Sequence, residues 1–313
     1  MCYERTDMAI ESAALFNKSK EEVSKINGVI VEEEIKNEIH ISKVKITDQN
    51  GAEAVGKPVG EYITIDIDFF MDKGEKFRDD LMDVVSHELK KIINIEKKST
   101  VFVIGLGNEK ITPDALGPKV VDNLNITRHL FEEAPVYTDE NTQSVCAISP
   151  GVLGITGIET VEVIKGISDR VKPGAVICID ALATRSIKRL SSSIQISDTG
   201  ITPGAGVGNR RHTINYQTIG VPVIALGVPT VVDGATIAND SIRLLCDAVG
   251  NYSSQTTKGF IEKLNDEDRY SLVKEILRPY GSGLIVTPKD IDSLIEDMAI
   301  IIASSINRAL GNE

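Results

Sequence analysis

The chain has 313 residues and a formal net charge of −12, because 46 Asp and Glu outnumber 34 Lys and Arg. This balance argues against direct binding of nucleic acid, which needs clustered basic side chains, and leaves proteins and small molecules as partners. Hydrophobic residues make up 42% of the chain, which is sufficient for the core of one large α/β domain.

The sequence lacks the marks of a membrane or secreted protein. No run of 18 apolar residues is present, and the polar N-terminus, Met1 to Asp7, does not resemble a signal peptide. We therefore expect a cytoplasmic protein that makes no contact with a membrane. The four cysteines, at positions 2, 146, 178 and 246, show no C-x-x-C spacing and indicate neither a zinc site nor a disulfide framework.

The first hundred residues predict a mixed β/helix segment. Residues 8–16 have the apolar spacing of a helix, and residues 28–47 are predicted to form two strands. Residues 62–68 alternate with period 2, as in a half-buried strand. Residues 75–95 carry the apolar positions of an amphipathic helix.

From residue 99 onward, the pattern of strand, glycine turn and helix repeats. Strands are expected near 100–105, 144–148, 175–180 and 222–227, and helices near 113–129, 158–169 and 234–249. This order predicts a doubly wound, mainly parallel α/β sheet core. An insertion near 186–218 carries a predicted strand at 193–198, and a C-terminal helix is expected over about 289–310.

Two of these strands lead directly into acidic segments. The strand that begins at Val101 continues into Gly105-Leu106-Gly107-Asn108 and then reaches Asp114. The strand that begins at Ala175 ends on Asp180. Ligands and chemistry gather at the carboxyl ends of parallel strands, so both carboxylates are expected there. Two carboxylates that share one proton can activate water against an amide bond.

Each aspartate also has a purely structural interpretation. Thr112 is a good helix N-cap and Pro113 suits the first helical position, so Asp114 would fall in the first turn, where the helix dipole favours negative charge. Helix capping alone is the alternative for Asp114. For Asp180, whose pKa should be raised by burial, the alternative is a carboxylate that only orients a loop.

Glycine-rich segments and Arg185 offer further candidates. Gly105-Leu106-Gly107-Asn108 is a weak dinucleotide-binding motif, because the glycine required at position 110 is Lys110. The loop from Gly200 to Gly208 could cradle an anion or an extended peptide backbone, or form a surface turn. Arg185 could stabilise the charge of the carboxylate pair or make an ordinary surface salt bridge.

These features together resemble the spore germination protease family, the endopeptidases that degrade small acid-soluble spore proteins. The resemblance covers almost the whole chain, and the segments that carry it are RTDMAIE (5–11), GLGN (105–108), TPDALGP (112–118), PGVLGITG (150–157), IDALATR (179–185), QISDTGI (195–201), GVGN (206–209) and GVPTVVD (227–233).

The resemblance implies an aspartic-type endopeptidase that needs no cofactor or metal and assembles as a homotetramer. Its catalytic residues would be Asp114 and Asp180, with Asn108 and Arg185 as supporting residues. Its substrates would be small acid-soluble spore proteins, which places it in the spore core.

The resemblance also implies a zymogen. Residues 1–7 would be a propeptide, removed by the enzyme itself through a cut between Asp7 and Met8. Residues 8–313 would then form a single protease domain, made of the N-terminal β/helix segment 8–97 and the core 98–313.

Two other interpretations remain open. A hydrogenase-maturation-type endopeptidase resembles the same core, and there a bound metal ion positions the substrate. Asp114 would be one ligand, but such a site also needs a histidine, and neither His129 nor His212 lies in a recognisable motif. An acidic α/β binding module would require Asp114 and Asp180 to lie far apart or to serve only as structural hydrogen-bond acceptors.

Overall fold

The computed structural model describes residues 6–14, 26–67, 70–93, 95–96, 99–133, 142–204, 212–242, 266–277 and 284–312. Its strands are β1 (Val29–Lys36), β2 (Ile39–Ile46), β3 (Gly60–Asp66), β4 (Val101–Gly105), β5 (Val145–Ile148), β6 (Ala175–Thr184), β7 (Ser193–Ser197), β8 (Val223–Asp233) and β9 (Ile285–Val286).

The named helices are α1 (Ala9–Ala14), α3 (Gln49–Val55), α4 (Glu75–Ile92), α5 (Leu116–Asp122), α6 (Arg128–Glu133), α7 (Leu153–Thr156), α8 (Thr160–Val171), α9 (Tyr216–Ile219), α12 (Asp266–Leu277) and α13 (Ile291–Leu310). Residues 234–242 are also helical. The described residues also form short 3₁₀ turns at η1 (Phe70–Asp72), η2 (Thr112–Asp114) and η4 (Ile187–Arg189).

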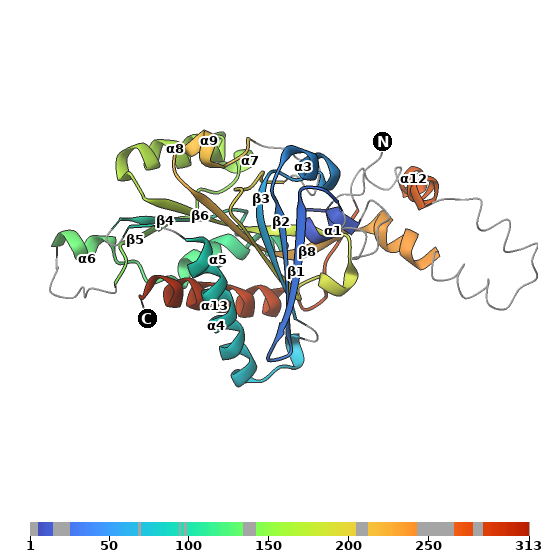
Figure 1. Cartoon of the computed structure of the whole chain (residues 1–313), viewed down its shortest axis with the longest axis horizontal. Coiled ribbons are helices and arrows are strands. Elements are labelled where there is room, and N and C mark those ends of the chain that lie inside the picture. The colour runs from blue at the N-terminus through green and yellow to red at the C-terminus, as the bar shows by residue number, and fades with distance from the viewer. Residues whose placement is uncertain are drawn as a thin grey trace, which may run out of the picture.

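One continuous sheet runs through the molecule in the order β1-β2-β3-β7-β8-β6-β4-β5, as Figure 1 shows, with β9 pairing with the end of β8. Strands β8, β6, β4 and β5 are parallel, which confirms the predicted doubly wound core. Strands β1, β2, β3 and β7 are antiparallel to their neighbours. The insertion strand β7 therefore joins the N-terminal β segment to the parallel core.

Helices cover both faces of the sheet. Helix α13 packs with α4 and α5 on one face, while α3, α8 and α9 lie on the other (Figure 1). Along β6, Ile177 and Ile179 point to the α13 face, and Val176 and Cys178 point to the α8 face. Burial on both faces explains why these strands appear in the sequence as continuous apolar runs.

Strand β6 is longer than predicted. It does not end at residue 180 but continues to Thr184, because β8 pairs with it along this whole stretch. Strand β8 likewise continues past residue 227 to Asp233. Strand β4 ends at Gly105, opposite Ile179, and so does not accompany the last part of β6. Asp180 is thus the first residue of β6 that pairs with β8 but no longer with β4.

The predicted helix over 113–129 is broken into η2, α5 and α6. A continuous α-helix through this region would need residue 118 to donate its N–H to the Asp114 carbonyl, but Pro118 has no N–H. That carbonyl instead accepts a hydrogen bond from the backbone of Asn108 at 3.0 Å. The prediction that Thr112 caps a helix was therefore wrong: Thr112 opens a 3₁₀ turn, and Ala115 precedes α5.

The remaining predicted elements are present with shifted ends. Residues 243–249 of the helix predicted over 234–249 lie outside the described residues, as do residues 205–208 of the glycine-rich loop. Among the described helices, none combines the length and apolar character that a membrane span requires.

The turn after β4 depends on close backbone packing against α5. A Cβ atom on Gly105 would lie 2.2 Å from the carbonyl oxygen of Gly117. We expect Gly105→Ala to lower the free energy of unfolding by about 3 kcal/mol, because backbone must move to admit the methyl group. Urea unfolding measures this change.

Gly166 provides a matched control for this substitution. It lies within α8, where an added Cβ atom meets no other atom within 4 Å. Gly166→Ala should raise the free energy of unfolding by up to about 1 kcal/mol, since alanine favours helix. If the two substitutions changed the free energy of unfolding equally, the backbones of β4 and α5 would not be in close contact at Gly105.

Candidate active site

The structure brings Asp114 and Asp180 to one cavity at the carboxyl ends of β4 and β6. From β4 the chain goes to β5 on one side, and it then returns to β6 on the other side. The boundary between β4 and β6 is thus a topological switch point, where open α/β sheets bind ligands. The cavity has a volume of about 510 Å³.

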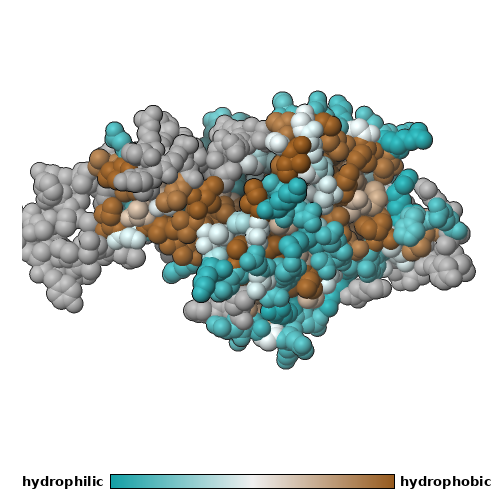
Figure 2. Space-filling model, turned by 180° about the vertical axis from the view of Figure 1, so that it is seen from behind, coloured by the Kyte–Doolittle hydropathy of each residue, from teal (hydrophilic) through white to brown (hydrophobic). Residues whose placement is uncertain are grey.

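The lining of this cavity is mainly apolar. It includes Leu106 after β4, Val152 and Leu153 after β5, and Val231 in β8. Ile111 and Ile285 also line it while keeping 53% and 47% of their surface exposed. Figure 2 shows further apolar residues that reach the surface in broad areas of the molecule. A mainly apolar cavity with a few convergent polar groups is typical of a binding site.

Burial shifts both carboxylates toward the protonated form. It raises the pKa of Asp114 to about 6, against the opposing effect of a hydrogen bond from the Asn108 backbone. Asp180 is only 7% exposed, and its pKa is raised well above the usual range by burial, then by the charges of Asp114 and Asp7. The Ala181 N–H, 2.9 Å from Oδ1, opposes this shift. Both carboxyl groups therefore have raised pKa values, and each one's charge affects the titration of the other.

A third carboxylate enters the cavity from the N-terminal segment. The Asp7 N–H donates to the Ala183 carbonyl at 3.0 Å, and the Ala183 N–H donates to Asp7 Oδ2 at 2.9 Å. Asp7 thereby lies along the part of β6 that extends beyond the end of β4. The predicted cleavage residue thus lines the same cavity as the two predicted catalytic aspartates.

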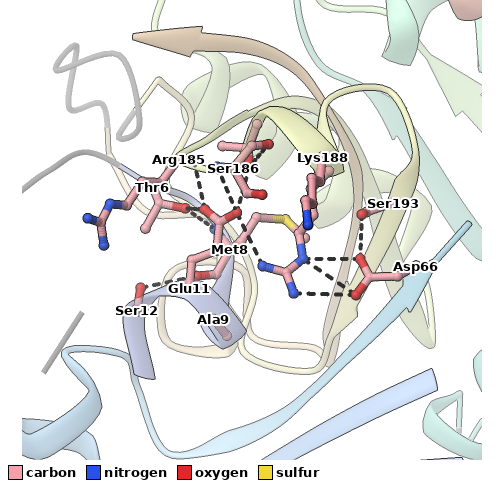
Figure 3. A network of polar contacts seen from close by, with 12 residues as sticks. Thr6, Met8, Ala9, Glu11, Ser12, Asp66, Arg185, Ser186, Lys188 and Ser193 are labelled. Carbon is pink, nitrogen blue, oxygen red and sulfur yellow. Dashed lines mark hydrogen bonds and ion pairs between the residues drawn. The ribbon is translucent and has the colours of Figure 1, made fainter. Parts of the chain in front are cut away.

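Glu11 anchors this N-terminal segment (Figure 3). Its carboxylate is only 5% exposed. Oε1 accepts from the Thr184 hydroxyl at 2.6 Å and from the Ser186 N–H at 3.1 Å. Oε2 accepts from the Arg185 N–H at 2.7 Å and from the Thr6 hydroxyl at 2.5 Å. These donors satisfy a carboxylate that would otherwise be costly to bury.

Arg189 completes this network from the side. Its Nη1 lies 3.4 Å from Glu11 Oε1, and its Nε donates to Asp66 Oδ1 at 3.1 Å (Figure 3). The Ser193 hydroxyl also donates to Asp66, at 2.5 Å. Through its ion pairs with Glu11 and Asp66, Arg189 ties the N-terminal segment to β3, and Ser193 adds a contact from β7.

The backbone N–H groups of the two predicted supporting residues, Asn108 and Arg185, make hydrogen bonds near the site. The Asn108 N–H donates to the backbone carbonyl of Asp114. The side-chain oxygen of Asn108 accepts a hydrogen bond from the Lys110 N–H at 3.1 Å. The Arg185 N–H bonds to Glu11, and neither Asn108 nor Arg185 lines the cavity. A role for either side chain in catalysis stays a prediction.

The residues described here offer no group of three or more His, Cys, Asp or Glu side chains placed to hold a metal ion. His129 and His212, the histidines considered for the metal-dependent interpretation, are both exposed and neither lines the cavity.

Sequence reasoning missed two residues that contact the Asp7 carbonyl. Lys57 Nζ donates to this oxygen at 3.0 Å, and Gln195 Nε2 donates to it at 3.2 Å. Gln195 had a detectable signal, because an amide within a wholly buried strand requires a polar partner. Lys57 follows a helix in a loop and shows no such signal.

The raised pKa of Asp180 predicts a pH-dependent effect on stability. The folded protein binds this proton more tightly than the unfolded chain, so ionisation destabilises the fold as pH rises above the unfolded pKa. Asp180→Asn removes that penalty. We expect the variant to unfold at a temperature several degrees above the parent at pH 7–8.

This difference should shrink toward zero as pH falls below about 3, where Asp180 is protonated in both the folded and the unfolded parent. Thermal unfolding of both proteins across this range measures it. Asp122→Asn, at an exposed position at the end of α5, is the matched control and should show a flat difference. A flat difference for Asp180→Asn as well would mean that Asp180 is not held protonated.

The comparisons with known proteins agree over nearly the full length of the chain. The germination protease family model matches residues 3–255 and 246–313. The germination protease of Caldanaerobacter subterraneus subsp. tengcongensis is 50% identical over 98% of this chain and 94% of its own length. Those of Clostridium perfringens and Priestia megaterium are 47% and 42% identical, over 98% and 99% of this chain and 94% of each relative.

Among solved structures, a nickel–iron hydrogenase maturation protease from Thermococcus kodakarensis matches 72% of this chain and 99% of its own, with 16% identity and a TM-score of 0.35. The family assignment rests on the sequence matches, which include the segments that contribute Asp7, Asp114 and Asp180 to the cavity. This chain belongs to the germination protease family of peptidases.

Proposed function

We propose that this peptidase is an aspartic-type endopeptidase that cuts small acid-soluble spore proteins after first cutting its own chain between Asp7 and Met8. The observation that carries the proposal is the presence of Asp7 in one cavity with Asp114 and Asp180. A zymogen that processes itself must present its own cleavage site to its catalytic groups. Membership of the germination protease family supports the choice of substrate.

The two aspartates take different roles in the proposed reaction. Asp114, whose pKa is about 6, is ionised at neutral pH and removes a proton from the attacking water. Asp180 is the more deeply buried of the two, and burial and its acidic neighbours raise its pKa, so we assign the shared proton to Asp180, which gives it to the leaving amine. The cut yields a new α-carboxyl group on Asp7 and an amino group on Met8, and it leaves Asp114 protonated and Asp180 ionised, so protons balance.

The contacts of the docked N-terminal segment support a prediction of what a protein substrate presents. Met8 and Ala9, which follow the proposed cut, are fully buried. Glu11, four residues after Asp7, accepts hydrogen bonds from Thr184, Arg185 and Ser186. A substrate segment with an acid, an apolar residue, a small residue and a second acid in this order would make the same contacts.

Loss of either aspartate should stop self-cleavage. Asp114→Asn and Asp180→Asn remove the base and the acid, and each should slow the cut by about 100-fold or more. Mass spectrometry of the full chain over time measures loss of the segment before Met8. Asp122→Asn, outside the cavity, is the control and should process at the parent rate.

A near-parent rate in either active-site variant would remove that residue from the mechanism. The same time course with a chelator tests the metal-dependent alternative. Self-cleavage that continues in the chelator agrees with the aspartate mechanism, whereas cleavage that stops would favour a bound metal ion.

The unequal pKa values predict a bell-shaped pH profile. For self-cleavage of the full chain, followed by mass spectrometry, the rate of the cut should rise with a midpoint near pH 6 as Asp114 ionises. It should fall at higher pH as Asp180 loses its proton.

Asp7→Asn in the full chain should shift only the alkaline limb of this profile. The charge of Asp7 is one of the groups that raise the pKa of Asp180, so its removal lets Asp180 ionise at lower pH. A shift of the acidic limb instead would reverse the assigned roles of the two aspartates.

A further inference from the structure

We propose that Lys57 and Gln195 form the oxyanion-binding site for self-cleavage of the Asp7–Met8 bond. The inference rests on the proposed function, because it assumes that this bond is the one that is cut. It assigns a catalytic contact to two residues that donate hydrogen bonds to the carbonyl oxygen of Asp7.

The sheet places Gln195 in line with Asp180. In the pairing register, Asp180 of β6 is opposite Gly227 of β8, and Gly227 is opposite Gln195 of β7. Directly paired residues point to the same face of a sheet, so Asp180 and Gln195 flank Gly227 on one face. Gly227 has no side chain, and Leu182 of β6 packs over it, with its Cγ 2.6 Å from where a Gly227 Cβ atom would lie.

The N-terminal segment is anchored to both β6 and β7. Asp7 is bonded to Ala183 in β6, and the N–H of Ala9 is bonded to Gln195 Oε1 in β7, at 2.7 Å. Because β8 lies between β6 and β7, the chain must pass over β8 between these two anchors. The Asp7–Met8 bond lies in the part of the chain that makes this crossing.

The side-chain amide of Gln195 holds both sides of that bond. Its Nε2 donates to the Asp7 carbonyl oxygen at 3.2 Å, and its Oε1 accepts from the Ala9 N–H at 2.7 Å. A single amide thus serves as a donor before the bond and an acceptor after it, as a neighbouring strand would. This arrangement restricts rotation of the peptide unit that is to be cut.

Lys57 supplies the second donor to the same oxygen. Its Nζ lies 3.0 Å from the Asp7 carbonyl oxygen. Burial lowers the pKa of Lys57, and the charges of Asp7 and Glu11 oppose this effect. A donor removed from bulk water interacts more strongly with a developing negative charge than an exposed one would.

The two donors match the charge that forms in the reaction. When water attacks the Asp7 carbonyl carbon, Asp114 takes one water proton and the carbonyl oxygen becomes an oxyanion. Lys57 Nζ and Gln195 Nε2 then hold this oxyanion. The C–N bond to Met8 breaks as the carbonyl reforms, and Asp180 gives its proton to the leaving nitrogen. Water is the only co-reactant, and no group is oxidised or reduced.

The test measures self-cleavage of the full chain by mass spectrometry in three variants. Lys57→Met keeps the length of the side chain but removes the donor, and it should slow the cut about 100-fold or more. Gln195→Glu keeps the acceptor for Ala9 and replaces the donor by a carboxylate, so it should slow the cut at least as much. Lys57→Arg keeps a charged donor and should retain a rate between those of the parent and Lys57→Met.

Lys73→Met is the matched control, because Lys73 pairs with the exposed Glu38 away from the cavity. It should process at the parent rate. Hydrogen exchange of residues 6–14, in an Asp180→Asn background that blocks the cut, separates catalysis from docking. If Lys57 acts in catalysis and not in docking, the double variant Lys57→Met, Asp180→Asn should show the same protection of residues 6–14 as Asp180→Asn alone.

Three results would overturn the proposal. They are parent-like cleavage in both Lys57→Met and Gln195→Glu, loss of segment protection in step with loss of cleavage, and equal rates in Lys57→Met and Lys57→Arg. Failure of the proposed function would look different. There the parent itself would not be cut between Asp7 and Met8, or Asp114→Asn would be cut normally.

Discussion

The site depends on two neighbouring strands of unequal length. Strand β4 ends opposite Ile179, whereas β6 continues through Asp180 to Thr184 with β8 as its partner. Backbone groups on the β4 side of this extension need other partners, since unpaired buried N–H and C=O groups are costly. Asp7 provides them for Ala183. The early end of β4 thus makes room for the cavity and leaves the backbone of Ala183 free to hold the N-terminal segment that enters it.

The cavity concentrates acidic groups in a place where their charges are unfavourable. Asp114 and Asp180 have raised pKa values because of burial, and Asp7 adds to the shift of Asp180. Such an arrangement opposes folding at neutral pH, which is common where a site is organised for chemistry. Glu11 is the contrast: it is as buried as Asp180, but backbone and hydroxyl donors surround it. The donors around Glu11 suit it to anchor the N-terminal segment, whereas the acidic neighbours of Asp180 suit that residue to hold and release a proton.

The sequence was sufficient to predict the elements that local patterns determine. The apolar runs before Gly105 and Asp180 identified the parallel core, and a strand followed by an acid located the cavity. Contacts between distant segments could not be predicted in this way. The Thr184 hydroxyl that holds Glu11 lies 173 positions further along the chain, and no periodicity links the two. The length of β6 was also missed, because it depends on pairing with β8 and not on its own residues.

The contacts on the two sides of the proposed cut are unequal, and this makes the reaction directional. Before the bond, the described contacts run mainly through Asp7 to Ala183, Lys57 and Gln195. After it, Met8 and Ala9 are buried, Glu11 is held by its donors, and the chain remains covalently attached. Cutting therefore turns the N-terminal piece into a separate short peptide, which gains translational freedom when it dissociates. The part that stays behind keeps its high local concentration, so loss of the leader, and not of residues 8–14, is the favoured outcome.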